Sequence, residues 1–454
     1  METLQRMYNR GSVVTGPYDI ENSAAFGGGH GLQNTLANDG DSKKKWTISM
    51  WVKRSEIGVQ TGLFGAANTI VNFMSDDILR ISLYTGSATY YYDTARVFRD
   101  TSAWYHIVFQ CDTTDGTAAN RTKLWINGEL NTAHRTQYDT SANISQNMEF
   151  TVGLDASNMQ IGYFYSGQYQ LDGYMADIYF TDNVANDADA FGEYDEDSGI
   201  WKPKAYAGAY GDNGFHLEFK EAAASATGIG KDTSGNGHNF DTGGAHPSQA
   251  TDTPTNNFAV GNTLNPSGVF SEGATRWVSP TGSLGDDGTW NLATMALTGG
   301  NWYCEAKMIS TTNTYYQVGI NPYHPNDSFA SRLMYRSDGN IYNAGSGGNT
   351  SGHTTYTAGD IIGMAYNTSA NTVIFSKNGT AIVTKTAIAR DDPYFFGGTA
   401  LSSGTWTADY NFGGYANYSI SSPQTDANGY GTFEYAPPTG YYALCTKNLA
   451  EFGG

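Results

Sequence analysis

Cysteine is scarce in this chain of 454 residues. The sequence has no CxxC pair and no His/Cys cluster, which argues against a metal–thiolate site. The cysteines are odd in number, lie far apart and each sit in a strand-like run, so we expect buried, reduced thiols. They are Cys111, Cys304 and Cys445.

Long apolar runs are also missing. No stretch of 18 apolar residues occurs, and the polar start Met1–Tyr8 lacks the apolar core of a signal peptide. We therefore expect no membrane insertion. We expect synthesis in a cytoplasm, with export, if any, by another route such as cell lysis.

Basic residues are few. The 25 Lys and Arg face 44 Asp and Glu, which gives a net charge of −19. Nucleic acids and anionic membrane surfaces require basic patches, so neither is an expected partner. Charged residues make up only 15% of the chain, whereas aromatics reach 14% and glycines number 55. This composition favours turns and sheet faces, and tyrosine-rich faces can also stack on sugars.

Motifs for catalysis are absent as well. There is no GxSxG, no Cys–His pairing and no phosphate loop, and Gly27–Gly29 precedes no strand–helix unit. The histidines are scattered, and His106 lies inside a strand pattern, where a core or hydrogen-bonded residue is expected. The sequence thus predicts a protein that is not an enzyme and needs no cofactor, with calcium left open.

Short segments that alternate aromatic or branched residues with polar ones are abundant. Such alternation predicts strands with one buried face. Asn127-Gly128 and Asn378-Gly379 add the signal of type I′ hairpins. We therefore predict an all-β fold of two antiparallel β-sandwiches. The segments are Trp46–Lys53, Trp104–Phe109, Lys123–Gly128 and Leu171–Phe180, followed by Trp302–Lys307, Tyr316–Ile320, Gly359–Ala365, Thr372–Gly379 and Pro393–Phe396.

The length of the chain predicts two or three domains. Residues 1–22 form an arm without a strand pattern, and the first sandwich covers 23–195. Residues 196–265 form a turn-rich connector, and the second sandwich with a C-terminal strap covers 266–454. The connector should be ordered because apolar residues anchor it on a neighbouring domain: Phe215, Leu217, Phe219 and Phe240.

The strand motifs also carry a family resemblance. "WTISMWVKRS", "WYHIVF", "KLWINGE" and "LDGYMADIYF" resemble concanavalin A-like (laminin-G-like) domains, a fold used mainly to bind glycans. "WYCEAK", "YQVGI", "GDIIGMAYN", "VIFSKNG" and "PYFF" resemble a SPRY domain, a bent β-sandwich, over roughly residues 285–415. With "GKDTSGNGHNF" and Tyr435–Gly440, the whole order resembles bacteriophage virion proteins of the tail-fibre type.

This resemblance implies a virion structural protein that contacts other virion proteins and host surface polysaccharide. The alternative is a protein that decorates the capsid or tail without binding a host. The arm would attach the protein to the virion, with Leu4, Met7 and Tyr8 as apolar anchors and Arg6 or Arg10 meeting acidic groups. Because tail fibres hang on symmetric parts, we expect a homo-oligomer, with a trimer favoured.

Candidate ligand-binding residues come from both sandwiches. Tyr90 and Tyr92 could stack on sugar rings at a rim, although alternate tyrosines of a strand more often pack in a core. In the second sandwich, Tyr323 and His324 fall in a loop of the kind that SPRY modules use for partners, or are plain turn residues.

Acidic residues provide two further candidates. Laminin-G-like domains often hold Ca²⁺ at a rim, which makes Asp76, Asp77, Asp172 and Asp177 candidate ligands, although Asp172 is also explained as a turn residue beside Gly173. Glu193, Asp195 and Asp197 alternate like the acids of sandwich-fold glucanases, and this pattern is the basis of a less favoured polysaccharide depolymerase hypothesis. A solvated acidic loop is the other interpretation.

Overall fold

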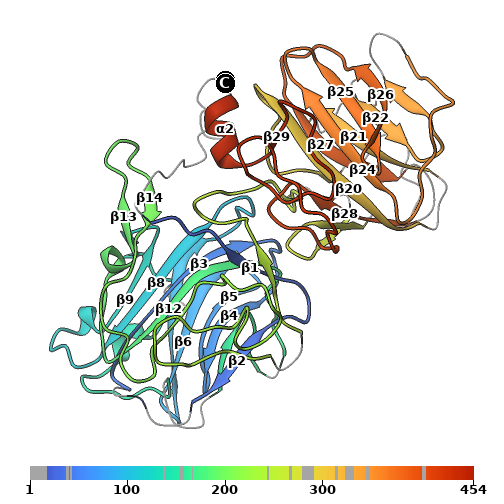
Figure 1. Cartoon of the computed structure of the whole chain (residues 1–454). Coiled ribbons are helices and arrows are strands. Elements are labelled where there is room, and N and C mark those ends of the chain that lie inside the picture. Colours follow the sequence, from blue (N-terminus) through green and yellow to red (C-terminus); the bar gives the residue numbers. More distant parts are fainter. Residues whose placement is uncertain are drawn as a thin grey trace. The chain divides into compact units, whose positions relative to one another are not determined.

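The computed structural model describes residues 18–36, 40, 43–135, 139–152, 158–165, 167–242, 245–264, 268–278, 291–311, 315–322, 332–343, 348–400 and 405–453. The chain divides into an N-terminal unit that ends at Thr255 and a C-terminal unit that begins at Asn256. Both are built almost entirely of antiparallel sheets (Figure 1), which confirms the all-β prediction.

The N-terminal unit contains two large antiparallel sheets. The eight-stranded sheet has the order β10-β9-β8-β3-β12-β1-β16, with β15 paired to β12. Its strands are β1 (Ser23–Phe26), β3 (Lys45–Arg54), β8 (Tyr105–Asp112), β9 (Thr122–Ile126), β10 (Glu129–Leu130), β12 (Gly173–Asp182), β15 (Phe215–Leu217) and β16 (Ser248–Ala250).

The six-stranded sheet of this unit has the order β2-β11-β4-β5-β6-β7. Its strands are β2 (Leu32–Thr35), β4 (Thr61–Ala66), β5 (Thr69–Phe73), β6 (Ile78–Tyr84), β7 (Thr89–Val97) and β11 (Asn158–Ile161). The separate hairpin β13 (Gly192–Tyr194) and β14 (Trp201–Pro203) and the short 3₁₀ turns η1 (Ala118–Asn120), η2 (Ser141–Asn143) and η3 (Ala188–Ala190) complete the unit.

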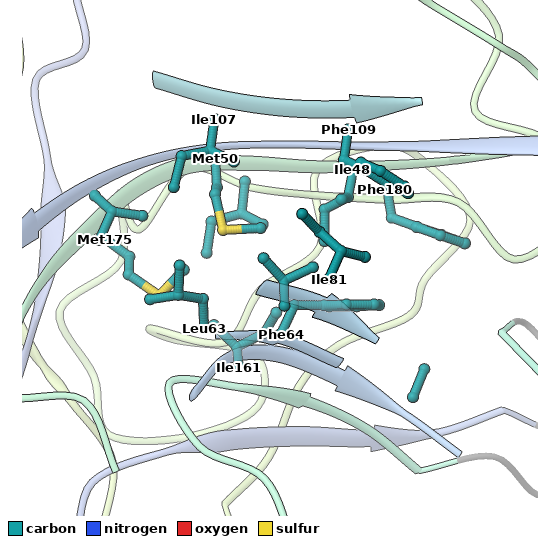
Figure 2. Packing of buried hydrophobic residues seen from close by; sticks show 14 of the residues in the cluster. Ile48, Met50, Leu63, Phe64, Ile81, Ile107, Phe109, Ile161, Met175 and Phe180 are labelled. Carbon is teal, nitrogen blue, oxygen red and sulfur yellow. The ribbon is translucent and has the colours of Figure 1, made fainter. Parts of the chain in front are cut away.

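The two sheets face each other across an apolar core. Figure 2 shows Ile48 and Met50 from β3 and Ile107 from β8 pointing toward Phe64 from β4 and Ile81 from β6. These side chains are fully buried, and each strand sends alternate residues inward. Polar residues of the same strands therefore lie on the two outer faces, which is where a site can form.

The segment predicted as a connector is divided between the two units. Residues 196–255 belong to the N-terminal unit, where Phe215, Leu217, Phe219 and Phe240 are buried in the core. The strand β15 pairs with β12 and β16 pairs with β1, so this segment extends the eight-stranded sheet. The four apolar side chains that predicted an anchor are therefore the ones that hold this segment in the core of the N-terminal unit.

The C-terminal unit also contains two antiparallel sheets. One has the order β17-β18-β28-β20-β24-β25-β26, with β29 parallel to β20, and the other has the order β19-β27-β21-β22-β23. The first comprises β17 (Val269–Ser271), β18 (Arg276–Val278), β20 (Asn301–Thr311), β24 (Ile361–Asn367), β25 (Thr372–Lys377), β26 (Thr380–Thr386), β28 (Trp406–Asn411) and β29 (Tyr442–Ala443). The second comprises β19 (Asn291–Leu292), β21 (Tyr316–Pro322), β22 (Leu333–Arg336), β23 (Ile341–Asn343) and β27 (Tyr394–Ala400).

The C-terminal strap is held by one buried carboxylate. Glu305 of β20 accepts hydrogen bonds from the backbone N–H groups of Glu434 (3.0 Å) and Tyr435 (2.8 Å) and from the Tyr418 hydroxyl (2.9 Å). The chain then ends in the helix α2 (Thr446–Phe452). Burial raises the pKa of Glu305, and these donors act in the opposite direction. The strap is therefore an ordered part of this unit.

Two local predictions are confirmed. Asn127 (φ 50°) and Gly128 (φ 79°) join β9 to β10, and Asn378 (φ 49°) and Gly379 (φ 78°) join β25 to β26, as type I′ hairpins require. The three cysteines are free and buried. Burial raises the pKa of the Cys445 thiol to about 12.

Candidate functional site

A polar pocket lies on the outer face of the six-stranded sheet. Its floor is the β2–β11 pair, in which Gln33 lies opposite Gln160 and Leu32 lies opposite Ile161. Because Leu32 and Ile161 are buried in the core, the alternation of the strands sends Gln33 and Gln160 outward. The cavity has a volume of about 300 Å³. It is lined by Gly29, His30, Gly31, Gln33, Asn158, Gln160, Tyr163, Gly167, Gln170 and Thr242.

The amide groups of the pocket are held in a fixed arrangement. The Oε1 atom of Gln33 accepts hydrogen bonds from Asn158 Nδ2 (3.1 Å) and from the Tyr163 hydroxyl (2.8 Å). Oδ1 of Asn158 is buried and has no hydrogen-bond partner in the protein. Buried polar atoms are normally paired, so this oxygen is an acceptor available to a ligand or to water.

Tyr163 and His30 complete the walls. A Cβ atom at Gly31 would lie 2.2 Å from the Tyr163 ring, so only glycine allows the ring to pack there. Burial raises the pKa of Tyr163, which keeps the hydroxyl protonated. The backbone N–H of Gly27 donates to His30 Nδ1 (3.0 Å), so the proton of a neutral ring sits on Nε2, where it can be donated.

Two exposed tyrosines flank the pocket on the loop that follows β11. Phe164 is buried over β4, where a Cβ at Gly62 would meet its ring at 2.4 Å. Tyr169 stacks on Phe164 with ring centroids 4.6 Å apart, and Tyr165 packs edge-on at 4.9 Å. Tyr165 and Tyr169 nonetheless remain 49% and 38% exposed. An aromatic surface held in place in this way can stack on a ligand at little entropic cost.

The described lining of the pocket carries no carboxylate, ammonium or guanidinium group. None of its lining residues is Asp, Glu, Lys or Arg, among the residues that the structure describes. The pair of carboxylates on which most glycosidases depend is therefore missing from the described lining. Amide, hydroxyl and imidazole groups can exchange hydrogen bonds with a neutral, hydroxyl-rich ligand.

The tyrosines chosen from the sequence face the other way. Tyr92 on β7 is 2% exposed and packs against Phe109, and Tyr90 packs edge-on against Phe150 beside the same core. Buried Tyr92 and half-buried Tyr90 match the core-packing alternative, and the stacking hypothesis for these two residues stays a prediction. Burial raises the pKa of Tyr92 to about 12.

Sequence reasoning missed the loop that carries Tyr163, Tyr165 and Tyr169. The available signal was the density of aromatic and glutamine residues in "GYFYSGQYQ" (162–170), which follows no strand alternation. Tyr165 (φ 50°) and Tyr169 (φ 53°) have left-handed backbone conformations, which a pattern search for strands does not anticipate.

Among the candidate calcium ligands, Asp77 is fully engaged by the protein, whereas Asp76 keeps one buried oxygen, Oδ1, without a hydrogen-bond partner. Asp77 is buried and accepts hydrogen bonds from Gly58 N (2.7 Å), Arg99 Nε (2.8 Å) and Arg54 Nη2 (3.1 Å). Burial raises its pKa, but these donors prevail and hold it below the ordinary range. Asp76 pairs with Arg135, and the Asp172 backbone oxygen accepts from Ser55 N. Within the described ranges, no three His, Cys, Asp or Glu side chains form a metal-binding group.

The acidic run of the depolymerase hypothesis lies in a hairpin. Glu193 and Asp195 both pair with Lys202 at 3.4 Å. Asp195 also accepts from the backbone N–H of Ser198, the largest of the contacts that lower its pKa, and closes a turn. Asp197 is exposed in the same turn. The arrangement matches the solvated acidic loop rather than a pair of acids facing a substrate.

His106 lies in a structural network under this hairpin. The Trp201 indole N–H donates to His106 Nδ1 (2.9 Å), so Nε2 carries the proton of the neutral ring and donates to Ser49 Oγ (2.9 Å). A histidine fixed in this tautomer cannot accept a proton from Ser49. Burial lowers the pKa of His106 to about 3. The expectation of a partner-bonded core residue is confirmed.

The other candidates lie outside the described residues. These are Tyr323 and His324 of the second sandwich and Leu4, Arg6, Met7, Tyr8 and Arg10 of the arm. Their roles stay predictions. Among the described helices, none has the length and apolar character needed to cross a membrane.

Comparison with known proteins identifies the first domain. Residues 26–190 match the model of the concanavalin A-like lectin/glucanases superfamily. This part of the chain is therefore similar to concanavalin A-like domains, a superfamily whose name covers both lectins and glucanases. No curated protein sequence matches the chain.

Three solved structures show partial similarity. The SPRY domain of human HERC1 is 19% identical, with 30% of this chain and 87% of that chain covered and a TM-score of 0.27. A heptameric SAP-like pentraxin from Limulus polyphemus is 16% identical, with 37% and 79% covered and a TM-score of 0.28. A protein from Bacteroides ovatus described as carbohydrate-binding is 16% identical, with 51% and 60% covered and a TM-score of 0.37.

Proposed function

We propose that the N-terminal unit binds a neutral glycan in the pocket formed by Gln33, Asn158, Gln160 and Tyr163. The observation that carries this proposal is the unpartnered, buried Oδ1 of Asn158 in a lining without charged residues. A sugar hydroxyl can donate to that oxygen while it accepts from a neighbouring amide or imidazole N–H. The match of residues 26–190 to a superfamily of lectins and glucanases supports the same ligand class.

The exposed tyrosines extend this site. Apolar faces of pyranose rings pack on aromatic side chains, and Tyr165 and Tyr169 present such a surface on the loop that also carries Tyr163. A chain of several sugars would place one ring in the pocket and another on the tyrosines. Binding would not require calcium, because the described lining offers no carboxylate.

The biological setting that we propose is a bacteriophage virion, in which this site contacts host surface polysaccharide. Support comes from the resemblance of the ordered strand motifs to tail-fibre-type proteins. The arm residues Leu4, Arg6, Met7, Tyr8 and Arg10 would attach the chain to other virion proteins, and a homo-oligomer, trimer favoured, would multiply weak contacts with a repetitive polymer. The alternative is a decorating protein of head or tail that binds no host.

A glycan array probed with the full chain tests the proposal. We expect selective binding to neutral oligosaccharides that persists in EDTA. Asn158→Ala should reduce the affinity roughly tenfold, the effect of one or two lost hydrogen bonds. Tyr92→Phe, which alters only a hydroxyl in the core, is the matched control and should bind normally. Binding that depends on calcium, or that is unaffected by Asn158→Ala, would contradict the assignment of the pocket.

Adsorption of the purified chain to host cells distinguishes host-glycan recognition from decoration of the head or tail without host binding. The glycan-binding setting predicts that the purified chain binds cells and that Asn158→Ala lowers this binding. A chain that binds no cell surface yet coats virion heads, as seen by labelled micrographs, would instead establish the decorating role.

A further inference from the structure

A second cavity of the N-terminal unit lies on the outer face of the eight-stranded sheet, opposite in the sandwich to the proposed glycan pocket. Its volume is about 420 Å³, within the usual range of ligand sites. Four of its lining residues are acidic and one is basic. The lining consists of Tyr18, Asp19, Ile20, Glu21, Asn22, Asp177, Glu218 and Lys220.

Asp177 is the buried member of this lining. It lies at a bulge in β12, where the pairing with β3 shifts register between Ala176 and Tyr179, and its φ of 51° is left-handed. Such a conformation is unfavourable for most residues other than glycine. The bulge turns Asp177 out of the core and toward the cavity.

The two carboxylate oxygens of Asp177 differ in their environments. Oδ1 accepts hydrogen bonds from the Tyr18 hydroxyl (2.9 Å) and from His216 Nε2 (2.7 Å). Oδ2 is buried and has no partner in the protein, although the residue as a whole is only 2% exposed. The Tyr179 hydroxyl, 3.2 Å from that of Tyr18, also interacts with the Asp177 carboxylate. Burial raises the pKa of Tyr179, and this carboxylate raises it further. A carboxylate can accept about four hydrogen bonds, so the group keeps capacity for a further donor at Oδ2.

The remaining charges of the cavity favour a cation. Lys220 bonds to Glu218 at 2.7 Å and is itself 57% exposed at the side chain, so its ammonium group is engaged at the mouth. Asp19 and Glu21 are exposed on the segment before β1. Together with Asp177 they outnumber the single lysine, and an anionic ligand would be repelled.

The cation cannot be a tightly held metal ion on the residues described. Calcium takes six to eight oxygen ligands, whereas no group of three His, Cys, Asp or Glu side chains in a metal-binding arrangement occurs in the described part of the chain. An ammonium group needs less: one charge-assisted hydrogen bond to Asp177 Oδ2 and two further acceptors, such as Asn22 and Tyr18 in the walls.

We propose that this cavity binds a small ligand with a primary ammonium group, which donates to Oδ2 of Asp177. The site is separate from the glycan pocket, and the proposal does not rest on the function assigned there. Amino sugars with a free amine and lysine side chains share this chemistry.

Isothermal titration of the full chain with glucosamine tests this proposal. N-acetylglucosamine is the matched neutral ligand, and Nα-acetyl-lysine amide distinguishes a peptide source from a sugar source. We expect glucosamine or the lysine derivative to bind at least about tenfold more tightly than N-acetylglucosamine, because a hydrogen bond to a charged group is the strong kind. Equal binding of all three, or saturation by CaCl₂ in place of the amines, would overturn the proposal.

Two variants of the cavity and one control variant make the test independent of folding. Asp177→Asn retains the shape and tolerates positive φ, and it should weaken amine binding about tenfold. Glu21→Gln, at an exposed position, should weaken it about twofold without affecting the fold. Glu196→Gln removes the same charge from an exposed turn outside the cavity and should leave amine binding unchanged.

Amine binding that survives Asp177→Asn in a folded protein would refute the site. Neutral-glycan binding should be the same in all three variants.

Discussion

The two outer faces of the N-terminal sandwich use polar residues in opposite ways. On the eight-stranded sheet, most polar groups of the outer face, such as Lys53 and His106, are buried with partners at hydrogen-bonding distance, and Asp177 Oδ2 at the bulge in β12 is an exception. On the six-stranded sheet, polar groups line an open pocket, and Asn158 Oδ1 lacks a partner. Paired and buried groups hold the fold together, whereas unpaired groups that face a cavity are available to a ligand.

Breaking a buried pair on the outer face of the eight-stranded sheet should have the largest effect on stability. Lys53 Nζ lies 2.7 Å from Asp252 Oδ2, and both side chains are almost fully buried. Asp252→Ala removes the carboxylate and leaves a buried ammonium, so we expect a loss of about 3–5 kcal/mol in the free energy of unfolding. Urea denaturation measures it. The double variant Lys53→Met/Asp252→Leu should recover much of the loss, and a single variant as stable as the parent would show that the pair is not structural.

Lowering the pH should reduce the stability of the fold through His106, which lies on the same face of the sandwich. Burial lowers the pKa of His106 to about 3, below the ordinary value near 6.5. Between these values the unfolded chain binds a proton that the folded chain does not, so stability falls as the pH falls, by up to about 1.4 kcal/mol per pH unit. Denaturation at several pH values measures the slope, and His106→Gln should flatten it. A slope that His106→Gln leaves unchanged would contradict this account.

Removing the Trp201 donor from the hydrogen bonds around His106 should cause a smaller loss of stability. Trp201→Phe keeps the ring packed against the Asn127-Gly128 turn but deletes the N–H that donates to His106 Nδ1. We expect a loss of about 1–2 kcal/mol, the effect of one buried acceptor left unpaired. Thermal unfolding of the variant checks this value, and an unchanged midpoint would mean that water replaces the indole.

Substitutions beside the pocket of the six-stranded sheet should affect ligand binding more than stability. Tyr165→Ala and Tyr169→Ala remove exposed rings, so we expect stability to change by no more than about 0.5 kcal/mol. Loss of a stacking surface should weaken glycan binding roughly fivefold each. Paired measurements of unfolding and binding on each variant test the contrast. A variant that loses stability and keeps affinity would place these tyrosines with the structural residues instead.

Strand alternation was sufficient to predict the fold. The segment Trp46–Lys53 lies within β3, and Leu171–Phe180 overlaps β12 from Gly173 onward. Both Asn-Gly turns have the positive φ that the hairpin type demands. These features are local, because burial of one face and the geometry of a two-residue turn are written in neighbouring residues.

The site could not be predicted in the same way. Gln33 and Gln160 are 127 positions apart in the chain and meet only because β2 and β11 pair. Tyr90 and Tyr92 attracted attention as a cluster, but the register of β7 points them into the core. Asp177 sits in a run of apolar strand residues, and only the bulge in β12 turns it toward a cavity. Long-range pairing and a local register shift decide these cases, and neither is visible in a single sequence.

The most direct test of the central claim is a crystal structure of the chain with the neutral oligosaccharide that binds best on the array. The account predicts that a sugar ring occupies the pocket on the outer face of the six-stranded sheet. One of its hydroxyls should donate to Asn158 Oδ1, and a second ring should pack on Tyr165 or Tyr169. A sugar bound on any other surface of the N-terminal unit, with this pocket empty, would contradict the account.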